Sequence, residues 1–226
     1  MFRIVCTLLL TCLTATTVHA EMVKIPADRD TTLIEDPDGE RANGSGPTFF
    51  AGRTNQAALG IRRGLVRFDV AAVLPEKALI DSVTLSLYQN SNNVEQTPVS
   101  LHRVLDDWGE GGSSGGGGSG APAEPGDATW LQTFWNDQFW VREGGHFIQH
   151  ASATRMVGGT ATYVWPSTVN LVNDVRLWLH APQQNFGWLV MGDESTGGTA
   201  KRYNTREGSD SSRHPMLTVE YHLPSE

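Results

Sequence analysis

The stretch from residue 185 to residue 221 restricts the fold of this chain more than any other segment. It contains an apolar, strand-like run, a polar connection and a second strand-like run. Charged side chains stand near the ends of these runs: Asp193 and Glu194 follow the first, and Arg206 and Glu207 lie in the connection. Charges beside buried strands must be paired or must bind a ligand. The segment therefore predicts buried β-structure whose ends are held by ion pairs or by a bound group.

Polar and apolar residues alternate along much of the chain after residue 20. From Leu79 to Tyr88, one face carries Val83, Leu85 and Leu87, which is typical of a half-buried antiparallel strand. Further segments with strand character are residues 64–70, 99–102, 160–164, 186–191 and 216–221. Many short strands separated by Gly, Asn, Asp and Pro predict an all-β fold, an antiparallel β-sandwich of the jelly-roll type.

One segment has the spacing of a helix instead. Between residues 168 and 180, apolar side chains recur at helical intervals, at Leu171, Val172, Val175, Trp178 and Leu179. Ser167 or Thr168 can cap the start of this helix, and Pro182 ends it. We expect a short crossover helix that covers one edge of the sandwich.

Residues 1–20 have the pattern of a secretory signal peptide. Arg3 precedes a short apolar run, and small residues lead to a predicted cleavage site after Ala20. We therefore expect an exported protein. Both cysteines, Cys6 and Cys12, lie in this leader, so the exported chain is expected to lack disulfides. Lipid anchoring at Cys12 is the weaker alternative, because the residues before it fit a lipoprotein site poorly.

The remaining sequence predicts one domain, residues 21–226. Residues 109–126, GEGGSSGGGGSGAPAEPG, have the composition of a linker, but neither flank is long enough for a sandwich of its own. We interpret them as a long flexible loop that either overhangs a binding face or is a tolerated insertion. No later segment has the roughly 20 apolar residues of a membrane-spanning helix. The formal net charge of −8 also argues against nucleic acid and anionic membranes as partners.

Several local motifs together resemble one known family. They are IEDPDG (34–39), NG (43–44), FAGRT (50–54), RGLVRFD (63–69), LHRV (101–104), DWGEG (107–111), GDATW (126–130), NFGW (185–188), GDE (192–194), TRE (205–207) and PMLTVEY (215–221). The whole resembles a DNRLRE domain, which is similar to carbohydrate-binding module family 96. The resemblance implies a jelly-roll sandwich of exported bacterial proteins, often joined to polysaccharide-degrading enzymes, with acidic polysaccharides such as alginate among its ligands. The long glycine-rich loop departs from the family, as does the lack of an enzyme domain in this sequence.

Sugar binding requires aromatic faces and hydrogen-bonding cations. Aromatic rings stack on the apolar faces of sugar rings, and arginine binds a sugar carboxylate through two parallel hydrogen bonds. The candidate carbohydrate-binding residues are Arg53, Arg103, Lys201, Arg202, His102, Trp135 and Trp140. Both tryptophans belong to the aromatic run FWNDQFW, which flanks the glycine-rich segment.

Other charged residues are assigned to structure or to a metal. Arg67 stands near Asp69, and Arg206 stands beside Glu207, which predicts a structural ion network in the strands. Oxygen-rich turns could hold calcium, which prefers six to eight oxygen ligands. The candidate calcium ligands are Asp28, Asp30, Asp193 and Glu194, although none fits the twelve-residue calcium loop. Turn capping by these carboxylates is the alternative.

Three functions remain open. The first is a non-catalytic carbohydrate-binding protein with polysaccharide as its partner, and the second is a structural or adhesive surface protein without sugar specificity. The third is a polysaccharide lyase that would use His102, Arg103 and Tyr203 for charge neutralisation and proton abstraction. No spacing in the sequence identifies an acid and base pair, so the lyase is the least favoured of the three.

Overall fold

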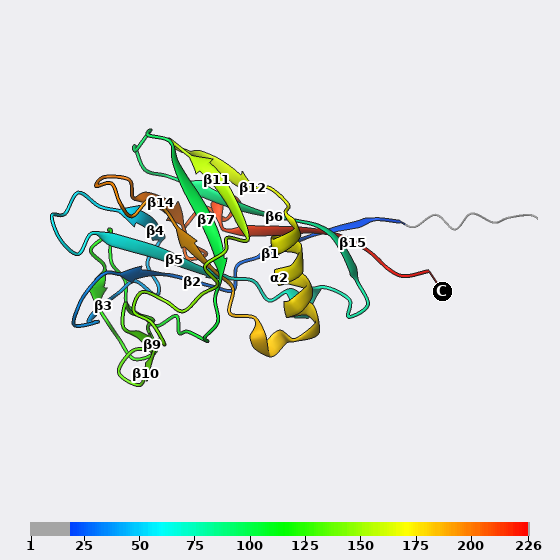
Figure 1. Cartoon of the computed structure of the whole chain (residues 1–226), viewed down its shortest axis with the longest axis horizontal. Coiled ribbons are helices and arrows are strands. Elements are labelled where there is room, and N and C mark those ends of the chain that lie inside the picture. The colour runs from blue at the N-terminus through cyan, green and yellow to red at the C-terminus, as the bar shows by residue number, and fades with distance from the viewer. Residues whose placement is uncertain (1–18, 226) are drawn as a thin grey trace, which may run out of the picture.

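The computed structural model describes residues 19–225, in which strands predominate (Figure 1). Two α-helices occur in this part of the chain, Val70–Val73 (α1) and Val169–His180 (α2). The predicted all-β sandwich with a short helix is confirmed. Of the predicted signal peptide, only His19 and Ala20 lie within the described residues. Within those residues, no helix combines the length and the apolar character needed to cross a bilayer.

The strands pair antiparallel in two layers that are joined through one shared strand. The first layer contains β1 (Glu21–Pro26), β15 (Met216–His222), β6 (Leu79–Gln89), β12 (Ala161–Trp165), β14 (Lys201–Asn204) and β4 (Thr48–Arg53). The second contains β2 (Arg29–Ile34), β5 (Ile61–Arg67), β13 (Trp188–Met191), β7 (Thr97–Arg103) and β11 (Ala153–Val157). Short pieces complete the set: β3 (Arg41–Ala42) with β8 (Ala121–Pro122), β9 (Gln132–Phe134) with β10 (Gln138–Phe139), and the 3₁₀ turns Pro182–Gln184 and Ser211–Arg213.

Strand β4 crosses from the first layer to the second at Gly52. Ala51 pairs with Lys201 of β14, whereas Gly52 pairs with Arg62 of β5. Gly52 has a φ of +118°, and a Cβ atom at this position would lie 2.9 Å from the Cα of Ala200. Only glycine adopts this conformation and tolerates this approach without strain. The corner therefore explains the glycine within FAGRT.

The main core lies between the two layers and includes the apolar face of α2. Val83 and Leu85 of β6 are fully buried, as their alternation predicts. The rings of Trp178 and Trp188 meet edge to face with centroids 4.4 Å apart. Aromatic pairs of this kind add to the stabilisation that comes from apolar burial.

A second core covers the outer face of the second layer. Leu33, Leu65 and Leu189 point to this side, and the segment 104–147 packs over them with Trp108, Trp130 and Trp140 among its buried residues. In Figure 1 the parts of this segment that carry β9 and β10 are seen at the lower left, below β2 and β5. Both faces of β5 and β13 consequently carry buried residues, which explains why Leu65 and Val66 of β5 and the run WLVM of β13 are apolar without alternation.

Helix α2 forms where its spacing predicts it. The Thr168 Oγ1 accepts a hydrogen bond from the Leu171 N–H (3.0 Å), which satisfies one free N–H of the first turn. The buried stripe includes Val175 and Trp178 and packs beside β6 (Figure 1). The helix ends at His180, directly before the turn that contains Pro182.

The glycine-rich segment 109–126 is not free along its length, in contrast to the predicted flexible loop. Ser113 is buried, and its Oγ accepts a hydrogen bond from the Gly44 N–H (3.0 Å). The Gly115 N–H donates to the side chain of Asn43 (2.7 Å). Glycine here permits close approach of two main chains rather than freedom of the loop. The composition of the segment does not reveal these contacts, because they are made with residues distant in the sequence.

Candidate functional site

The basic residues predicted to bind sugar do not converge on one face. Lys201 is fully buried, and its ammonium donates hydrogen bonds to the carbonyl oxygens of Glu95 and Asn93. Burial lowers the pKa of Lys201. Its prediction as a binding residue is wrong, because β14 alternates and places Lys201 on the same inward face as Tyr203.

Arg103 is half-buried and is paired with a buried carboxylate. Its Nε pairs with Oδ1 of Asp174 on α2 at 2.9 Å. The other oxygen of Asp174 accepts hydrogen bonds from Ser152 Oγ (2.5 Å) and Trp188 Nε1 (2.9 Å). Arg103 thus joins β7 to the helix, and any ligand would have to compete with Asp174 for it.

Arg53 and Arg202 have partners different from those of Lys201 and Arg103. An N–H of the Arg53 guanidinium donates to the Glu194 carbonyl oxygen at 3.4 Å. The Arg202 guanidinium donates to the Asn90 side chain and to its carbonyl oxygen (2.9 Å), and also lines a cleft of about 450 Å³. Phe50 and the main chain of Gly118 line the same cleft, which we call the loop cleft. Of the predicted basic residues, Arg202 is best placed to meet a ligand.

The two tryptophans predicted to bind sugar also differ in their surroundings. Trp140 is buried in the second core, and its indole N–H donates to the Thr129 carbonyl oxygen (2.9 Å). The prediction that Trp140 binds sugar is therefore wrong. Trp135 is half-buried, while Phe139 is the large exposed aromatic residue of this run. Of this run, Trp140 packs into the core that covers the second layer.

His102 is buried on β7 between two hydrogen-bond partners. Its Nδ1 lies 3.0 Å from the Ile148 carbonyl oxygen and its Nε2 lies 2.8 Å from Ser100 Oγ. Burial lowers the pKa of His102, and Arg63 and His150 lower it further, against the Ile148 carbonyl and Glu194. We interpret this histidine as a neutral structural residue.

The lowered pKa of His102 predicts that acid destabilises the fold. Below pH 6.5, the ordinary histidine pKa, His102 is protonated in the unfolded chain, whereas in the folded chain it stays neutral until the pH reaches its lowered pKa. The free energy of unfolding should therefore fall as the pH falls from 6.5 towards the lowered pKa of the folded state. Denaturant unfolding of the wild type and His102→Gln over this range tests it. Identical pH profiles for the two proteins would contradict the prediction.

The residues proposed for a lyase do not come together. His102 and Arg103 are neighbours on β7 and point to opposite faces of the sheet, because successive strand residues alternate. Tyr203 is fully buried in the main core, where its ring stacks with Phe49 at 5.2 Å. The structure therefore does not support a shared role for these three residues.

The predicted ion network is divided among different partners. Arg67 pairs with Asp28, which lies in the bend between β1 and β2, and not with Asp69. The Asp69 carboxylate instead caps α1 by accepting a hydrogen bond from the Ala72 N–H (3.3 Å). The expected pairing of Arg67 with Asp69 is therefore wrong.

The predicted calcium ligands also have separate roles. Asp28 forms a salt bridge with Arg67, and both carboxylate oxygens of Glu194 bind the Arg63 guanidinium at 2.7 and 2.9 Å. Asp193 accepts hydrogen bonds from the N–H and hydroxyl of Ser195, which is the turn-capping alternative. Asp30 alone among the four belongs to a carboxylate cluster.

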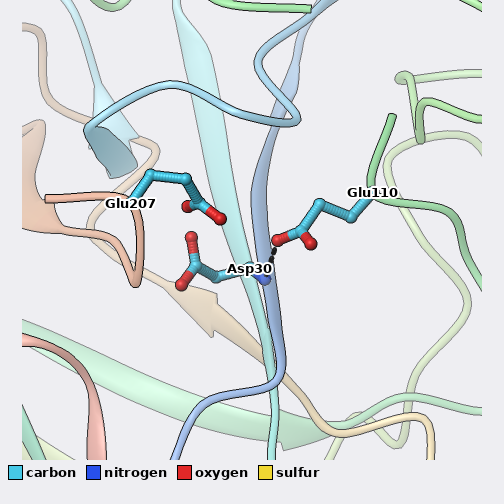
Figure 2. A group of neighbouring side chains, drawn as sticks. All are labelled: Asp30, Glu110 and Glu207. Carbon is cyan, nitrogen blue, oxygen red and sulfur yellow. Dashed lines mark hydrogen bonds between the residues drawn. The ribbon is translucent and has the colours of Figure 1, made fainter. Parts of the chain in front are cut away.

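The cluster consists of Asp30, Glu110 and Glu207, and we call it the carboxylate cluster (Figure 2). One oxygen from each residue lies within 4.8 Å of the others. Arg206 pairs with both glutamates, so the predicted pair Arg206–Glu207 forms (2.9 Å) but is shared with Glu110. Burial raises the pKa of Asp30 well above its ordinary value, and Glu207 and Glu110 add to this, against a hydrogen bond from the Arg206 N–H. Sequence reasoning missed Glu110, which lies 80 residues from Asp30.

A second unpredicted feature is a groove on the outer face of the first layer. It has a volume of about 360 Å³, and we call it the sheet-face groove. Its side chains come from β1, β6, β12 and β15 and from the 3₁₀ turn before β15. They are Lys24, Ser86, Tyr88, Thr162, Ser211, Ser212, Arg213, His214, Met216 and Thr218.

The register of the strands brings these side chains together. Thr218 of β15 lies opposite Lys24 of β1, and Tyr88 of β6 lies opposite Thr162 of β12. The guanidinium of Arg213 stacks over the Tyr88 ring at 4.4 Å and pairs with Asp210 at 3.0 Å. Cations, hydroxyl groups and one aromatic ring therefore share one open surface. Of these positions, the alternation of the sequence from Leu79 to Tyr88 predicted that Ser86 and Tyr88 share the face opposite Val83, Leu85 and Leu87.

No protein-family model matches the chain, and no curated protein matches it. The resemblance to DNRLRE domains therefore stays a prediction from the sequence motifs.

Proposed function

We propose that this protein is an exported, non-catalytic carbohydrate-binding protein that holds an acidic polysaccharide in the sheet-face groove. The observation that carries the proposal is the contrast between the two outer sheet faces. Segment 104–147 covers the outer face of the second layer, whereas the first layer keeps an open groove lined by Lys24, Arg213 and His214. The family resemblance, which implies the same class of ligand, is a separate and untested support.

The chemistry of the groove suits a polyuronate chain. Sugar hydroxyls exchange hydrogen bonds with serine and threonine hydroxyls, and sugar carboxylates attract ammonium and guanidinium groups. Lys24 is exposed, and Arg213 is exposed although it pairs with Asp210, so both cations remain accessible at the surface. Exposed ion pairs contribute little individually, so we expect weak, salt-sensitive binding that depends on several contacts.

Titration calorimetry with oligoalginate, and with cello-oligosaccharides of the same length, tests the proposal. We expect oligoalginate to bind and the double variant Lys24→Ala/Arg213→Ala to bind about tenfold more weakly, a loss of about 1.4 kcal/mol. The matched control is Lys77→Ala/Arg155→Ala, which removes two exposed cations outside the groove. Unchanged thermal stability in both double variants would show that only binding is affected.

Three results would contradict this assignment. Equal binding by the double variant, together with a loss in Arg202→Ala, would move the site to the loop cleft. Absence of glycan binding, combined with self-assembly or capture of a surface partner, would favour the structural or adhesive alternative. Release of unsaturated sugar from the probe would instead establish a lyase.

A further inference from the structure

The carboxylate cluster contains more negative charge than its protein partners neutralise. Asp30, Glu110 and Glu207 supply three carboxylates, and Arg206 is the cation that the described part of the chain places in salt-bridge contact with them. If all four groups are ionised, their net charge is −2. The adjacent Arg29 is bound to Asp107 and to the Trp108 carbonyl oxygen. Desolvated like charges are costly unless a ligand or a proton compensates them.

Two oxygens in the cluster have no partner although they are buried. Arg206 binds both oxygens of Glu110 and the Oε1 of Glu207, and its main-chain N–H donates to the Oδ2 of Asp30 (2.9 Å). Asp30 Oδ1 and Glu207 Oε2 remain without a hydrogen bond. Asp30 is completely buried, and Figure 2 shows its carboxylate and that of Glu207 pointing toward one another. This arrangement of free acceptors is what a bound cation would require.

We propose that Asp30, Glu207 and Glu110 form a binding site for one calcium ion. The donors are all oxygens, which a hard divalent cation prefers. Ligand oxygens at about 2.3 to 2.6 Å from calcium can lie as much as about 5 Å apart, which accommodates the observed spacing. Water would supply the remaining ligands, because calcium takes six to eight. A single divalent ion would also neutralise the net charge of −2.

The three ligands come from segments that are distant in the sequence. Asp30 lies on β2, Glu110 opens the glycine-rich segment, and Glu207 lies in the connection between β14 and β15. A calcium ion would therefore tie the covering segment 104–147 and the C-terminal connection to the second layer. None of its ligands lines the sheet-face groove, so the site does not depend on glycan binding.

Thermal unfolding and titration calorimetry with calcium chloride alone test the proposal on the full exported chain. Millimolar calcium, compared with chelator, should raise the melting temperature by about 5 °C or more, with one ion bound per chain. Glu207→Gln and Asp30→Asn should lose the shift. The matched control Asp193→Asn, which alters a turn carboxylate outside the cluster, should keep it.

The measurement on the wild type decides the question even if a cluster variant fails to fold. No calcium-dependent shift and no heat of binding in the wild type would overturn the proposal and leave a proton as the group that neutralises Asp30. A calcium shift of equal size in Glu207→Gln would overturn it too, because the ion would then bind elsewhere.

Discussion

Replacing Asp174 by alanine should lower the free energy of unfolding by about 3 kcal/mol or more, and the melting temperature by about 10 °C. Asp174 is buried and accepts from Ser152, Trp188 and Arg103. Truncation leaves all three donors without their acceptor, and each unsatisfied buried group costs about 1 to 3 kcal/mol. The variant should therefore disturb the join between α2 and the second layer.

The effect should come from the lost acceptor rather than from the lost charge. Burial raises the pKa of Asp174 despite its hydrogen bonds, so ionisation of this carboxylate is not itself favourable to folding. Asp174→Asn keeps one acceptor oxygen and should cost clearly less than Asp174→Ala. Denaturant unfolding of both variants measures the difference.

The neighbouring Asn173→Ala provides the positional control, because Asn173 is exposed on the same helix. We expect its stability to stay within about 0.5 kcal/mol of the wild type. Equal stability of Asp174→Ala and Asn173→Ala would show that the buried polar group contributes nothing.

The elements that depend on local pattern were predictable. The alternation of Val83, Leu85 and Leu87 identified β6, and the helical stripe with its Thr168 cap identified α2. Both signals arise because one face of an element is buried and the other is not. Strand β14 lacks that signal, since one of its inward residues is Lys201.

Lys201 shows why the burial of a cation is difficult to predict from sequence. Lysine is almost never fully buried without partners, so an exposed position was the reasonable expectation. Here the partners are the carbonyl oxygens of Asn93 and Glu95, more than 100 residues away. Arg62 is similar: it is buried and donates to the carbonyl oxygens of Leu59 (2.9 Å) and Gly118. No periodicity encodes such main-chain acceptors.

The candidate sites were hidden for the same reason. The sheet-face groove needs the register of β1, β15 and β6 before Lys24, Tyr88 and Arg213 become neighbours. The carboxylate cluster needs a contact between Glu110 and a strand 80 residues earlier. The segment 185–221 did carry one usable signal, because the charges of Arg206 and Glu207 require partners. The pairing of Arg206 with Glu207 was predictable, but the participation of Glu110 was not.

Alanine at Gly109 should destabilise the protein by about 3 kcal/mol, whereas alanine at Gly116 should be nearly neutral. A Cβ at Gly109 would collide with the Gly126 carbonyl oxygen and lie 2.8 Å from its carbon, and the Gly109 N–H already donates to Thr133 (2.9 Å). At Gly116 no heavy atom lies within 4 Å of the added Cβ.

Thermal and denaturant unfolding of the two variants measure how firmly the glycine-rich segment is anchored. Gly116→Ala should even gain up to about 0.5 kcal/mol, because alanine reduces the conformational entropy of the unfolded chain. Near-neutral values for both substitutions would restore the flexible-loop interpretation of residues 109–126. A large loss at Gly109 alone would establish that the start of this segment is built into the fold. Glu110 would then be held where the carboxylate cluster requires it, because it follows Gly109 directly in the chain.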